Sequence, residues 1–383
     1  MPRRSGIKYF FARALLLAVA SLGLFAAVGA AAPPIRIALE APLSGSQSSN
    51  GLDMLRGVQL AARQANRHHG VLGRRIKIVK ADDKGDSALA KKVARRAIRK
   101  HIAAVIGPYN SSVGIVNLPI YLKNRVVPLH LTSSDDTRGM GITIQPKNSQ
   151  IAPLEETYIR STGAKRVTIL VDDTPNGAFT VGMADRLQQR LTADGVIVNR
   201  ISLVELANNP PPGYYSTKVL EAFATLPDMI YVSTYYPEGA EIAKALNTNP
   251  NGPNCLMGLA NVDPGFVTAA GLGPSQRCVF SGVPAAPQLP SAAKFVSQYR
   301  KAFKRAPGVW GVFTYDSAKL LFRAIERAGG TGFNRLQKRL KHTKNYHGQT
   351  GATTIDPATG YRTDLPFLHI LRVDSYKDFV ISP

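Results

Sequence analysis

The stretch AAVIGPYNSS, residues 103–112, joins a short apolar run to a glycine, a proline and a polar end. Ala103–Ile106 predicts a buried strand, and the residues that begin with Ser111 and Ser112 predict a helix. A strand that passes directly into a helix is the repeating unit of parallel α/β sheets. Because such sheets bind ligands beyond the carboxyl ends of their strands, this stretch indicates both a fold class and a candidate site.

The same alternation of strands and helices extends to both sides of this stretch. Apolar runs, or in Arg75–Ala81 an alternation of apolar and basic residues, predict nine strands. They are Ile35–Leu39, Arg75–Ala81, Ala103–Ile106, Val126–Leu129, Val167–Val171, Val198–Leu203, Met229–Ser233, Leu256–Gly258 and Val279–Val283. Apolar residues at helical spacing separate most of them. Two such series predict an α/β protein with two doubly wound, parallel-sheet lobes and right-handed crossovers. The length of 383 residues is enough for two or three domains.

The first 32 residues have the pattern of a secretory signal peptide. Arg3, Arg4, Lys8 and Arg13 precede an apolar run without acidic residues, Ala14–Ala32, which ends in small residues. We therefore expect export to the periplasm or outside the cell, and a chain without a lipid-carrying cysteine after the signal. The alternative is an uncleaved membrane anchor, since about 19 apolar residues could just span a bilayer.

The chain has two cysteines, Cys255 and Cys278, and each begins a short apolar run. If these runs are neighbouring parallel strands, both thiols lie at the same edge of the sheet. A disulfide there would close a loop of about 22 residues, which suits an exported protein. Two free, buried thiols are the alternative, because sequence alone does not give the pairing geometry.

The formal net charge of +23 does not indicate a nucleic-acid partner. Loss of the four basic residues of the signal lowers it to +19. Basic residues of the predicted helix Ser87–Lys100 lie opposite its apolar residues, and Lys338–Lys344 is a similar basic cluster. These patterns are typical of solvated helix faces, so the charge bears on solubility and contact with anionic surfaces.

Motifs of enzymes and of metal sites do not occur in the sequence. There is no G-x-S-x-G, H-E-x-x-H or G-x-x-x-x-G-K-[ST] motif. Gly271-Leu-Gly273 lacks the third glycine of a dinucleotide site, and His68-His69 has no nearby ligand pattern. We therefore expect a binding protein without catalytic residues, cofactor or metal.

Hydroxyl-bearing residues follow several of the predicted strands. Ser111 would begin a helix, where free N–H groups and the helix dipole favour an anion. Thr132 and Ser134 follow the strand Val126–Leu129, and Thr234–Glu238 follows Met229–Ser233. A carboxylate could accept hydrogen bonds from Ser111, from backbone N–H groups and from Thr132 or Ser134. Alternatively, Ser111 and Ser134 only cap helices.

Six motifs, taken in order, resemble a known family. They are IRIALEAPLSG (35–45), GVQLAARQANRHHGVLG (57–73), IVKADD (78–83), VIGPYNSS (105–112), YYPE (235–238) and a terminal G-x-x-G…I-D…G-x-R (348–362). Over essentially the whole chain after residue 32, this set resembles the type I periplasmic binding proteins. The leucine/isoleucine/valine-binding proteins of ABC transporters, with their amide- and urea-binding relatives, are the most similar branch.

The resemblance implies two discontinuous lobes joined by three crossing strands. Lobe one would be 33–150 plus 284–348, and lobe two would be 151–283 plus 349–383. A small-molecule ligand would lie in the cleft, and its binding would close the hinge. The resemblance further implies a monomer whose membrane partner is the permease of an ABC transporter.

The resemblance also assigns candidate ligand-binding residues. Ser111, Thr132 and Ser134 match the family positions that hold a ligand carboxylate. An aromatic residue that packs on the ligand matches Tyr235, and a second, from the loop 176–179, would be Phe179. Asn50 stands where the family has an aromatic residue in its first loop.

Ala260 is the most informative departure from the family, because the glutamate that binds the ligand ammonium should fall there. A desolvated charge without a partner costs several kcal/mol. The sequence therefore favours a ligand without an ammonium group: a carboxylic acid, an aromatic acid or an amide. Alternatively, Asp135, Asp136 or Asp263 supplies a carboxylate from a neighbouring loop.

We therefore expect the exported solute-binding component of an ABC transporter. A different class of function is a ligand-sensing protein that presents the same cleft to a receptor or regulator. An enzyme on this scaffold is disfavoured by the lack of a recognisable nucleophile–base pair.

Overall fold

The computed structural model describes residues 32–203 and 210–382. The predicted signal segment, residues 1–32, lies outside the described residues except for Ala32. Within the described residues, the helices are all too short or too polar to cross a bilayer.

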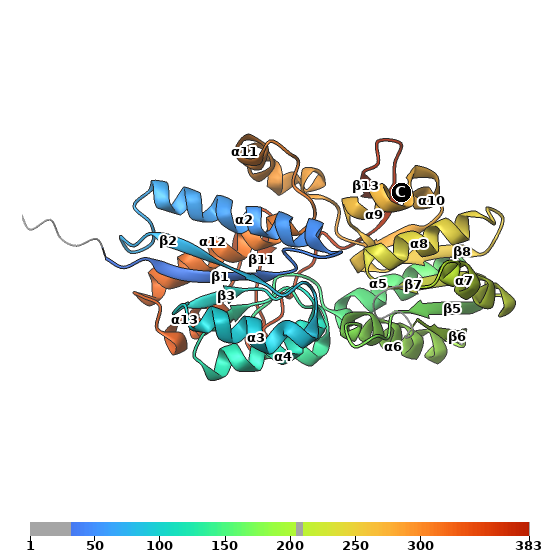
Figure 1. The fold of residues 1–383 in the computed structure, drawn as a ribbon, viewed down its shortest axis with the longest axis horizontal. Coiled ribbons are helices and arrows are strands. Elements are labelled where there is room, and N and C mark those ends of the chain that lie inside the picture. Colours follow the sequence, from blue (N-terminus) through green and yellow to red (C-terminus); the bar gives the residue numbers. More distant parts are fainter. Residues whose placement is uncertain (1–31, 204–209, 383) are drawn as a thin grey trace, which may run out of the picture. The chain divides into compact units, whose positions relative to one another are not determined.

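The first sheet has four parallel strands in the order β2-β1-β3-β4. Its strands are β1 (Ile35–Ala41), β2 (Ile76–Asp82), β3 (Ala104–Ile106) and β4 (Val127–Leu129). The helices around it are α2 (Ser48–Arg67), α3 (Ser87–Ile98), α4 (Ser111–Lys123), α11 (Ala293–Phe303), α12 (Trp310–Ala328) and α13 (Phe333–Lys341). Helices from two distant parts of the chain thus surround this sheet (Figure 1).

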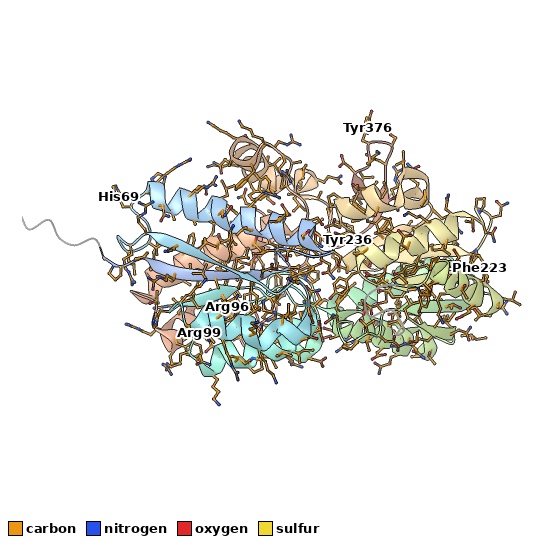
Figure 2. All side chains as sticks on the ribbon, viewed as in Figure 1. His69, Arg96, Arg99, Phe223, Tyr236 and Tyr376 are labelled. Atoms are coloured by element: carbon orange, nitrogen blue, oxygen red, sulfur yellow. A yellow bond between two sulfur atoms is a disulfide. The ribbon has the colours of Figure 1, made fainter. Side chains whose placement is uncertain are left out.

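Alternate side chains of β1 contact different helix layers. Ile37 and Leu39 belong to the large core that includes residues of α2 and α12. Ala38 belongs to a smaller core with residues of α3 and α4. Since neighbouring side chains of a strand point to opposite faces, helices cover this sheet on both sides. The basic residues of α3 remain exposed, as its periodicity predicted, and so does Arg99, which directly follows the helix; Figure 2 labels Arg96 and Arg99.

The second sheet has seven strands in the order β13-β12-β9-β8-β7-β5-β6. Its strands are β5 (Arg166–Val171), β6 (Ile197–Ser202), β7 (Met229–Ser233), β8 (Asn254–Met257), β9 (Val279–Gly282), β12 (His369–Val373) and β13 (Phe379–Ile381). Its main helices are α5 (Asn148–Ser161), α6 (Ala178–Ala193), α7 (Tyr214–Ala224), α8 (Tyr236–Asn247), α9 (Pro264–Ala270) and α10 (Leu272–Gln276). The first five strands in sequence are parallel, as predicted. β12 and β13 add an antiparallel edge that the strand–helix alternation did not predict.

The chain passes between the two sheets three times. It leaves the first sheet after β4, enters α5 and builds the parallel part of the second sheet. After β9 it returns to the first sheet as α11, α12 and α13. The hairpin of β10 (Tyr346–Gly348) and β11 (Gly351–Thr353) precedes the last passage to β12. The two-lobed α/β architecture with three crossings, expected from the sequence, is therefore observed.

The return of α12 to the first sheet depends on a close helix–helix contact. A Cβ atom added at Gly57 of α2 would lie 2.0 Å from the carbonyl oxygen of Gly311. Thr314 of α12 donates a hydrogen bond of 2.9 Å to the carbonyl of Met54. The backbones of α2 and α12 can approach this closely because neither Gly57 nor Gly311 has a side chain.

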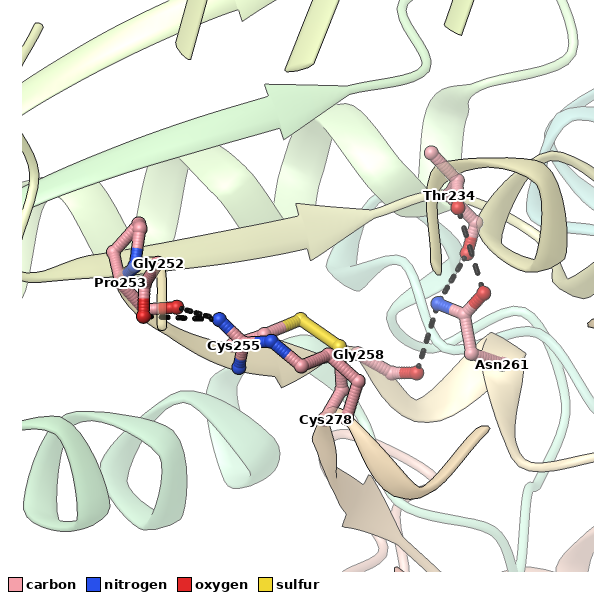
Figure 3. The surroundings of a disulfide bond; sticks show 8 residues. Thr234, Gly252, Pro253, Cys255, Gly258, Asn261 and Cys278 are labelled. Atoms are coloured by element: carbon pink, nitrogen blue, oxygen red, sulfur yellow. Dashed lines mark hydrogen bonds between the residues drawn. A yellow bond between two sulfur atoms is a disulfide. The ribbon is translucent and has the colours of Figure 1, made fainter. Parts of the chain in front are cut away.

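Cys255 and Cys278 form a disulfide in the structure, with their Cα atoms 4.6 Å apart (Figure 3). Leu256 of β8 and Val279 of β9 are paired in the neighbouring parallel strands, and each cysteine directly precedes one of these two residues. Beside the bridge, the Arg277 guanidinium donates to the carbonyls of Gly252 and Pro253. The bridge therefore closes the segment that contains the short helix η2 (Leu259–Asn261), α9 and α10.

Replacing both cysteines with alanine is expected to lower the free energy of unfolding by about 3 kcal/mol, because the unfolded chain regains the entropy of a loop of about 22 residues. Urea denaturation of the oxidised protein and the double variant measures the difference. Addition of a thiol reductant should bring the wild type to the level of the variant. A loss under about 1 kcal/mol would contradict a stabilising bridge.

Candidate ligand-binding site

A narrow cavity lies where the loops that follow the strands of both sheets meet. Its lining residues are Tyr109, Ser111, Leu131, Ser133, Gln145, Phe179, Tyr235, Leu259, Ala260 and Trp310. Most of them follow β3, β4, β7 or β8, which is the sheet edge expected to bind ligands. The free space is about 10 Å³, room for about one water molecule. A larger ligand therefore requires the two sides to move apart.

Aromatic side chains form much of the cavity wall. Tyr109 packs on Trp310 with ring centroids 5.6 Å apart, and both residues lie beside the first sheet. Phe179 and Tyr235, beside the second sheet, have centroids 6.0 Å apart. All four side chains are buried. One aromatic pair from each lobe suits a ligand with a flat or apolar body.

The N-terminus of α4 supplies hydrogen-bond donors to the cavity. Ser111 is its first residue, and its Oγ accepts a bond of 3.1 Å from the N–H of Ser134. Among the residues that the structure describes, Ser111 Oγ only accepts, so its hydroxyl proton is available for another acceptor. The Asn110 side chain makes no capping bond to the helix and donates instead to Gln47. The first turn of α4 therefore keeps the donors and the positive dipole end that favour an anion.

Thr132 and Ser134 do not line the cavity, although both were predicted to hold the ligand carboxylate. Thr132 Oγ1 lies 2.8 Å from His130 Nδ1 and 2.7 Å from Thr137 Oγ1. Ser134 Oγ caps the short helix η1 (Asp135–Thr137) by accepting from the N–H of Asp136. Leu131 and Ser133 line the cavity instead. Side chains alternate along an extended segment, so the cavity receives the odd-numbered positions and not the even-numbered ones.

A buried lysine that sequence reasoning missed holds this loop in place. Lys147 Nζ donates to the carbonyl oxygens of Thr132 (2.9 Å) and Ser134 (2.5 Å), and to Thr137 Oγ1 (2.8 Å). Burial lowers the pKa of Lys147 to about 7, while the nearby Asp135 and Asp136 act in the opposite direction. The bonds of Lys147 to the carbonyls of Thr132 and Ser134 hold the backbone on both sides of Ser133.

The other predicted residues divide between the cavity and the surrounding core. Tyr235, Phe179 and Ala260 line the cavity together with Ser111. Asn50 lies in α2, buried but outside the lining. Gln145 was missed because it lies on a segment that crosses between the sheets, and Trp310 because it begins α12, which no predicted strand directly precedes. The only available signal was that Trp310 is the single tryptophan of the chain.

The three aspartates considered as partners for a ligand ammonium all have other contacts. Asp135 pairs with Arg186 at 2.6 Å, and Asp136 contacts Ser134. Asp263 caps α9 by accepting from the N–H of Gly265, and burial raises its pKa to about 6. None of the three lines the cavity, and the described residues that do line it are all uncharged.

A second, polar pocket of about 300 Å³ shares Tyr235 with the cavity. Gly45–Gln47 and Lys84–Asp86 line it from the first lobe. Asp172 and Glu238 line it from the second lobe, and burial raises the pKa of both, that of Glu238 to about 7. Asp172 and Glu238 line this second pocket and not the aromatic cavity.

Direct hydrogen bonds join the two lobes next to these pockets. Ser49 Oγ of α2 lies 3.1 Å from both the Tyr236 hydroxyl and Asp263 Oδ1. The Tyr236 hydroxyl also donates to the carbonyl of Ser46, and Figure 2 shows Tyr236 at this junction. On another side, Asn176 Oδ1 accepts from the N–H and the hydroxyl of Ser87. These small polar contacts can break and re-form if the lobes separate.

Two α/β lobes, three crossing segments and a cavity between strand-end loops define a two-lobed ligand-binding protein. The family model described as periplasmic binding protein matches residues 34–367. The chain therefore belongs to the periplasmic binding protein family.

Known relatives are similar over most of the chain. The Leu/Ile/Val-binding protein BraC3 of Rhizobium johnstonii is 27% identical over 304 residues, which cover 77% of this chain and 80% of the relative. Leucine binding protein LivK of Thermotoga maritima has a similar fold, with a TM-score of 0.78 at 24% identity, covering 91% of this chain and 99% of that one. A Rhodopseudomonas palustris solute binding protein of an ABC transporter, in complex with 3,4-dihydroxy benzoic acid, has a TM-score of 0.78 at 18% identity, covering 91% and 96%.

Proposed function

We propose that this protein captures a small carboxylate-bearing ligand between its two lobes and delivers it to the permease of an ABC transporter. The observation that carries the proposal is an uncharged cavity with aromatic walls beside the N-terminus of α4, which has no side-chain capping bond from Asn110. Such a cavity offers hydrogen bonds to an anionic end and apolar contact to the remainder of the ligand. Export, a monomeric state and the permease partner are further parts of the proposal.

We propose further that the ligand lacks an α-ammonium group. Ala260 contributes a methyl group where the family resemblance places a glutamate, and the three nearby aspartates have other contacts. An ammonium would enter the cavity without a countercharge, at a cost of several kcal/mol. Aliphatic acids, aromatic acids and amides thus fit better than leucine, isoleucine or valine. The aromatic acid bound by the R. palustris protein belongs to this group of compounds.

Ligand capture requires movement of the lobes, which we place at 33–150 plus 284–348 and at 151–283 plus 349–383. The free space of about 10 Å³ does not admit an organic acid. The three crossing segments would act as the hinge, and the contacts of Ser49 and Ser87 with the second lobe would break on opening. Aromatic pairs from both lobes would then close on the ligand.

Thermal-shift measurements with amino acids, aliphatic and aromatic acids, amides and urea test the proposed ligand class. A ligand at 100 times its dissociation constant stabilises the folded state by about 2.7 kcal/mol, which gives a saturable rise in melting temperature. The largest rise is expected for an acid without an ammonium group. If leucine or valine gives the largest rise, the interpretation of Ala260 is wrong.

Ser111→Ala is expected to weaken binding of the best acid by about 10- to 100-fold, since a hydrogen bond to a charged group contributes about 1.5–3 kcal/mol. Isothermal titration calorimetry measures the loss. Ser161→Ala is the control for the same chemical change outside the site, because Ser161 is the exposed last residue of α5 and does not line the cavity. Equal affinities of the wild type and Ser111→Ala would contradict the anion site.

A further inference from the structure

Gln145 presents a hydrogen-bond acceptor that no residue of the described structure uses. It lies on the first segment that crosses between the sheets, lines the cavity, and is 2% exposed. Its Oε1 atom is buried without a hydrogen-bond partner among the described residues. A buried acceptor without a partner is costly, so such an atom on a residue that lines a cavity points to a partner supplied by a bound molecule.

The orientation of the Gln145 amide follows from its neighbours. Ser133 Oγ lies 2.7 Å from the carbonyl oxygen of Pro146, which can only accept. The single hydroxyl proton of Ser133 is therefore used there, and Ser133 Oγ must accept from Gln145 at 2.7 Å. Only the amide nitrogen can donate this bond. Oε1 is consequently the end that remains free.

The acceptor on Gln145 complements a neutral donor better than a charged one. The amide oxygen carries no formal charge, and the described residues that line the cavity are all uncharged. Lys147, the nearest buried cation in sequence, uses its Nζ on the loop carbonyls and on Thr137. A hydroxyl or an amide N–H would satisfy Oε1 without bringing an unpaired charge into the cavity.

We propose that Gln145 Oε1 accepts a hydrogen bond from an O–H or amide N–H group of the ligand and thereby selects hydroxylated or amide-bearing acids over their counterparts without the donor. This rests on the proposed function, since it describes the same cavity. Ser111 and the α4 N-terminus bind the carboxylate, and the aromatic pairs contact the apolar part of the ligand. Gln145 accepts the hydrogen bond from the additional donor. Ser133 acts as a positioning residue that fixes the amide of Gln145.

Matched acids that differ only in the donor provide the test, with dissociation constants measured by calorimetry on the full chain. The probes are benzoate with 3- and 4-hydroxybenzoate and with 4-carbamoylbenzoate, and 3-phenylpropanoate with 2-hydroxy-3-phenylpropanoate and phenylalanine. We expect the wild type to bind at least one donor-bearing acid about 10- to 100-fold more tightly than its parent. Gln145→Met, which keeps the length of the side chain but removes the acceptor, should reduce that preference to within about twofold.

Two further variants separate the acceptor from the general packing of the cavity. Ser133→Ala removes the anchor of the Gln145 amide but keeps Oε1, so affinity should fall while the preference for the donor persists. Gln145→Glu adds a charge and should narrow the gap between phenylalanine and its 2-hydroxy analogue by about tenfold or more. Circular dichroism and melting temperature establish that each variant is folded. If Gln145→Met does not fold, the result with Gln145→Glu decides whether Gln145 contacts the ligand.

The outcomes distinguish this inference from the proposed function. If no acid binds, the carboxylate proposal fails and the role of Gln145 falls with it. If acids bind but the wild type does not favour any donor-bearing member, the role of Gln145 is overturned while the carboxylate proposal stands. The same holds if Gln145→Met keeps the full preference.

Discussion

Asp53→Ala is expected to lower the free energy of unfolding by about 4–6 kcal/mol, because it leaves three buried donors without an acceptor, each worth about 1–3 kcal/mol. Asp53 lies in α2 and is buried. Its carboxylate accepts from the Tyr299 hydroxyl (2.8 Å) and from the N–H groups of Gly308 (3.1 Å) and Gly311 (2.6 Å). These donors belong to α11, to the loop after it and to the first turn of α12.

The same carboxylate positions one wall of the cavity. Trp310 lies between the two glycines that Asp53 binds, and its ring packs on Tyr109. Asp53→Ala should therefore also weaken binding of the best acid, although Asp53 does not line the cavity.

Urea denaturation measures the stability loss of Asp53→Ala. Asp53→Asn should lower the free energy of unfolding by about half as much, because it keeps the oxygen that accepts the hydrogen bonds from Tyr299 and Gly308. The matched surface control is Lys301→Ala on α11, which should change stability by less than about 0.5 kcal/mol. A loss near that of the control would show that Asp53 does not anchor the returning segment.

The fold could be predicted from sequence wherever each element has its own local pattern. The run Ala103–Ile106 and its neighbours predicted the parallel strands to within a few residues, because the central strands are apolar throughout and the edge strand β2 alternates apolar with basic residues. β12 and β13 could not be predicted this way. Short, partly exposed strands without intervening helices have no such pattern, and their pairing depends on the completed edge at β9.

Residues that line the cavity could be predicted best where they follow the end of a strand. Ser111 and Tyr235 are of this kind and do line the cavity, while their role in binding a ligand stays a prediction. Leu131 and Ser133 line the cavity and the predicted Thr132 and Ser134 do not, because successive side chains of the extended loop after β4 point to opposite sides. Lys147, which lies 15 residues away from Thr132 in sequence, holds the backbone of this loop. Such long-range contacts have no local signal.

Glu155 is expected to make stability depend strongly on pH between about 4.5 and 7. It lies in α5, and its Oε1 accepts from the hydroxyls of Tyr231 on β7 and Ser281 on β9. Burial raises its pKa from 4.5 to about 7, more than these two hydrogen bonds lower it. A raised pKa means that the folded state binds the proton more tightly than the unfolded state. The resulting stability is complete below pH 4.5 and is lost as the pH rises through 7.

Glu155→Gln removes this titration with little change in shape. A pKa that rises from 4.5 to about 7 corresponds to about 3.4 kcal/mol, at about 1.36 kcal/mol for each pH unit. The stability of the wild type relative to Glu155→Gln should therefore fall by up to that amount between pH 4.5 and pH 8. Urea denaturation of both proteins at both pH values measures this difference, in which all other titrating groups cancel.

Glu221→Gln provides the control for the same chemical change at the surface. Glu221 lies on α7 with an exposed side chain that pairs with Lys218. The stability of the wild type relative to this variant should change by less than about 0.5 kcal/mol between the two pH values. If Glu155→Gln behaves in the same way, the Glu155 carboxyl titrates as a solvated group. The core between α5, β7 and β9 would then have to admit water to the carboxyl group.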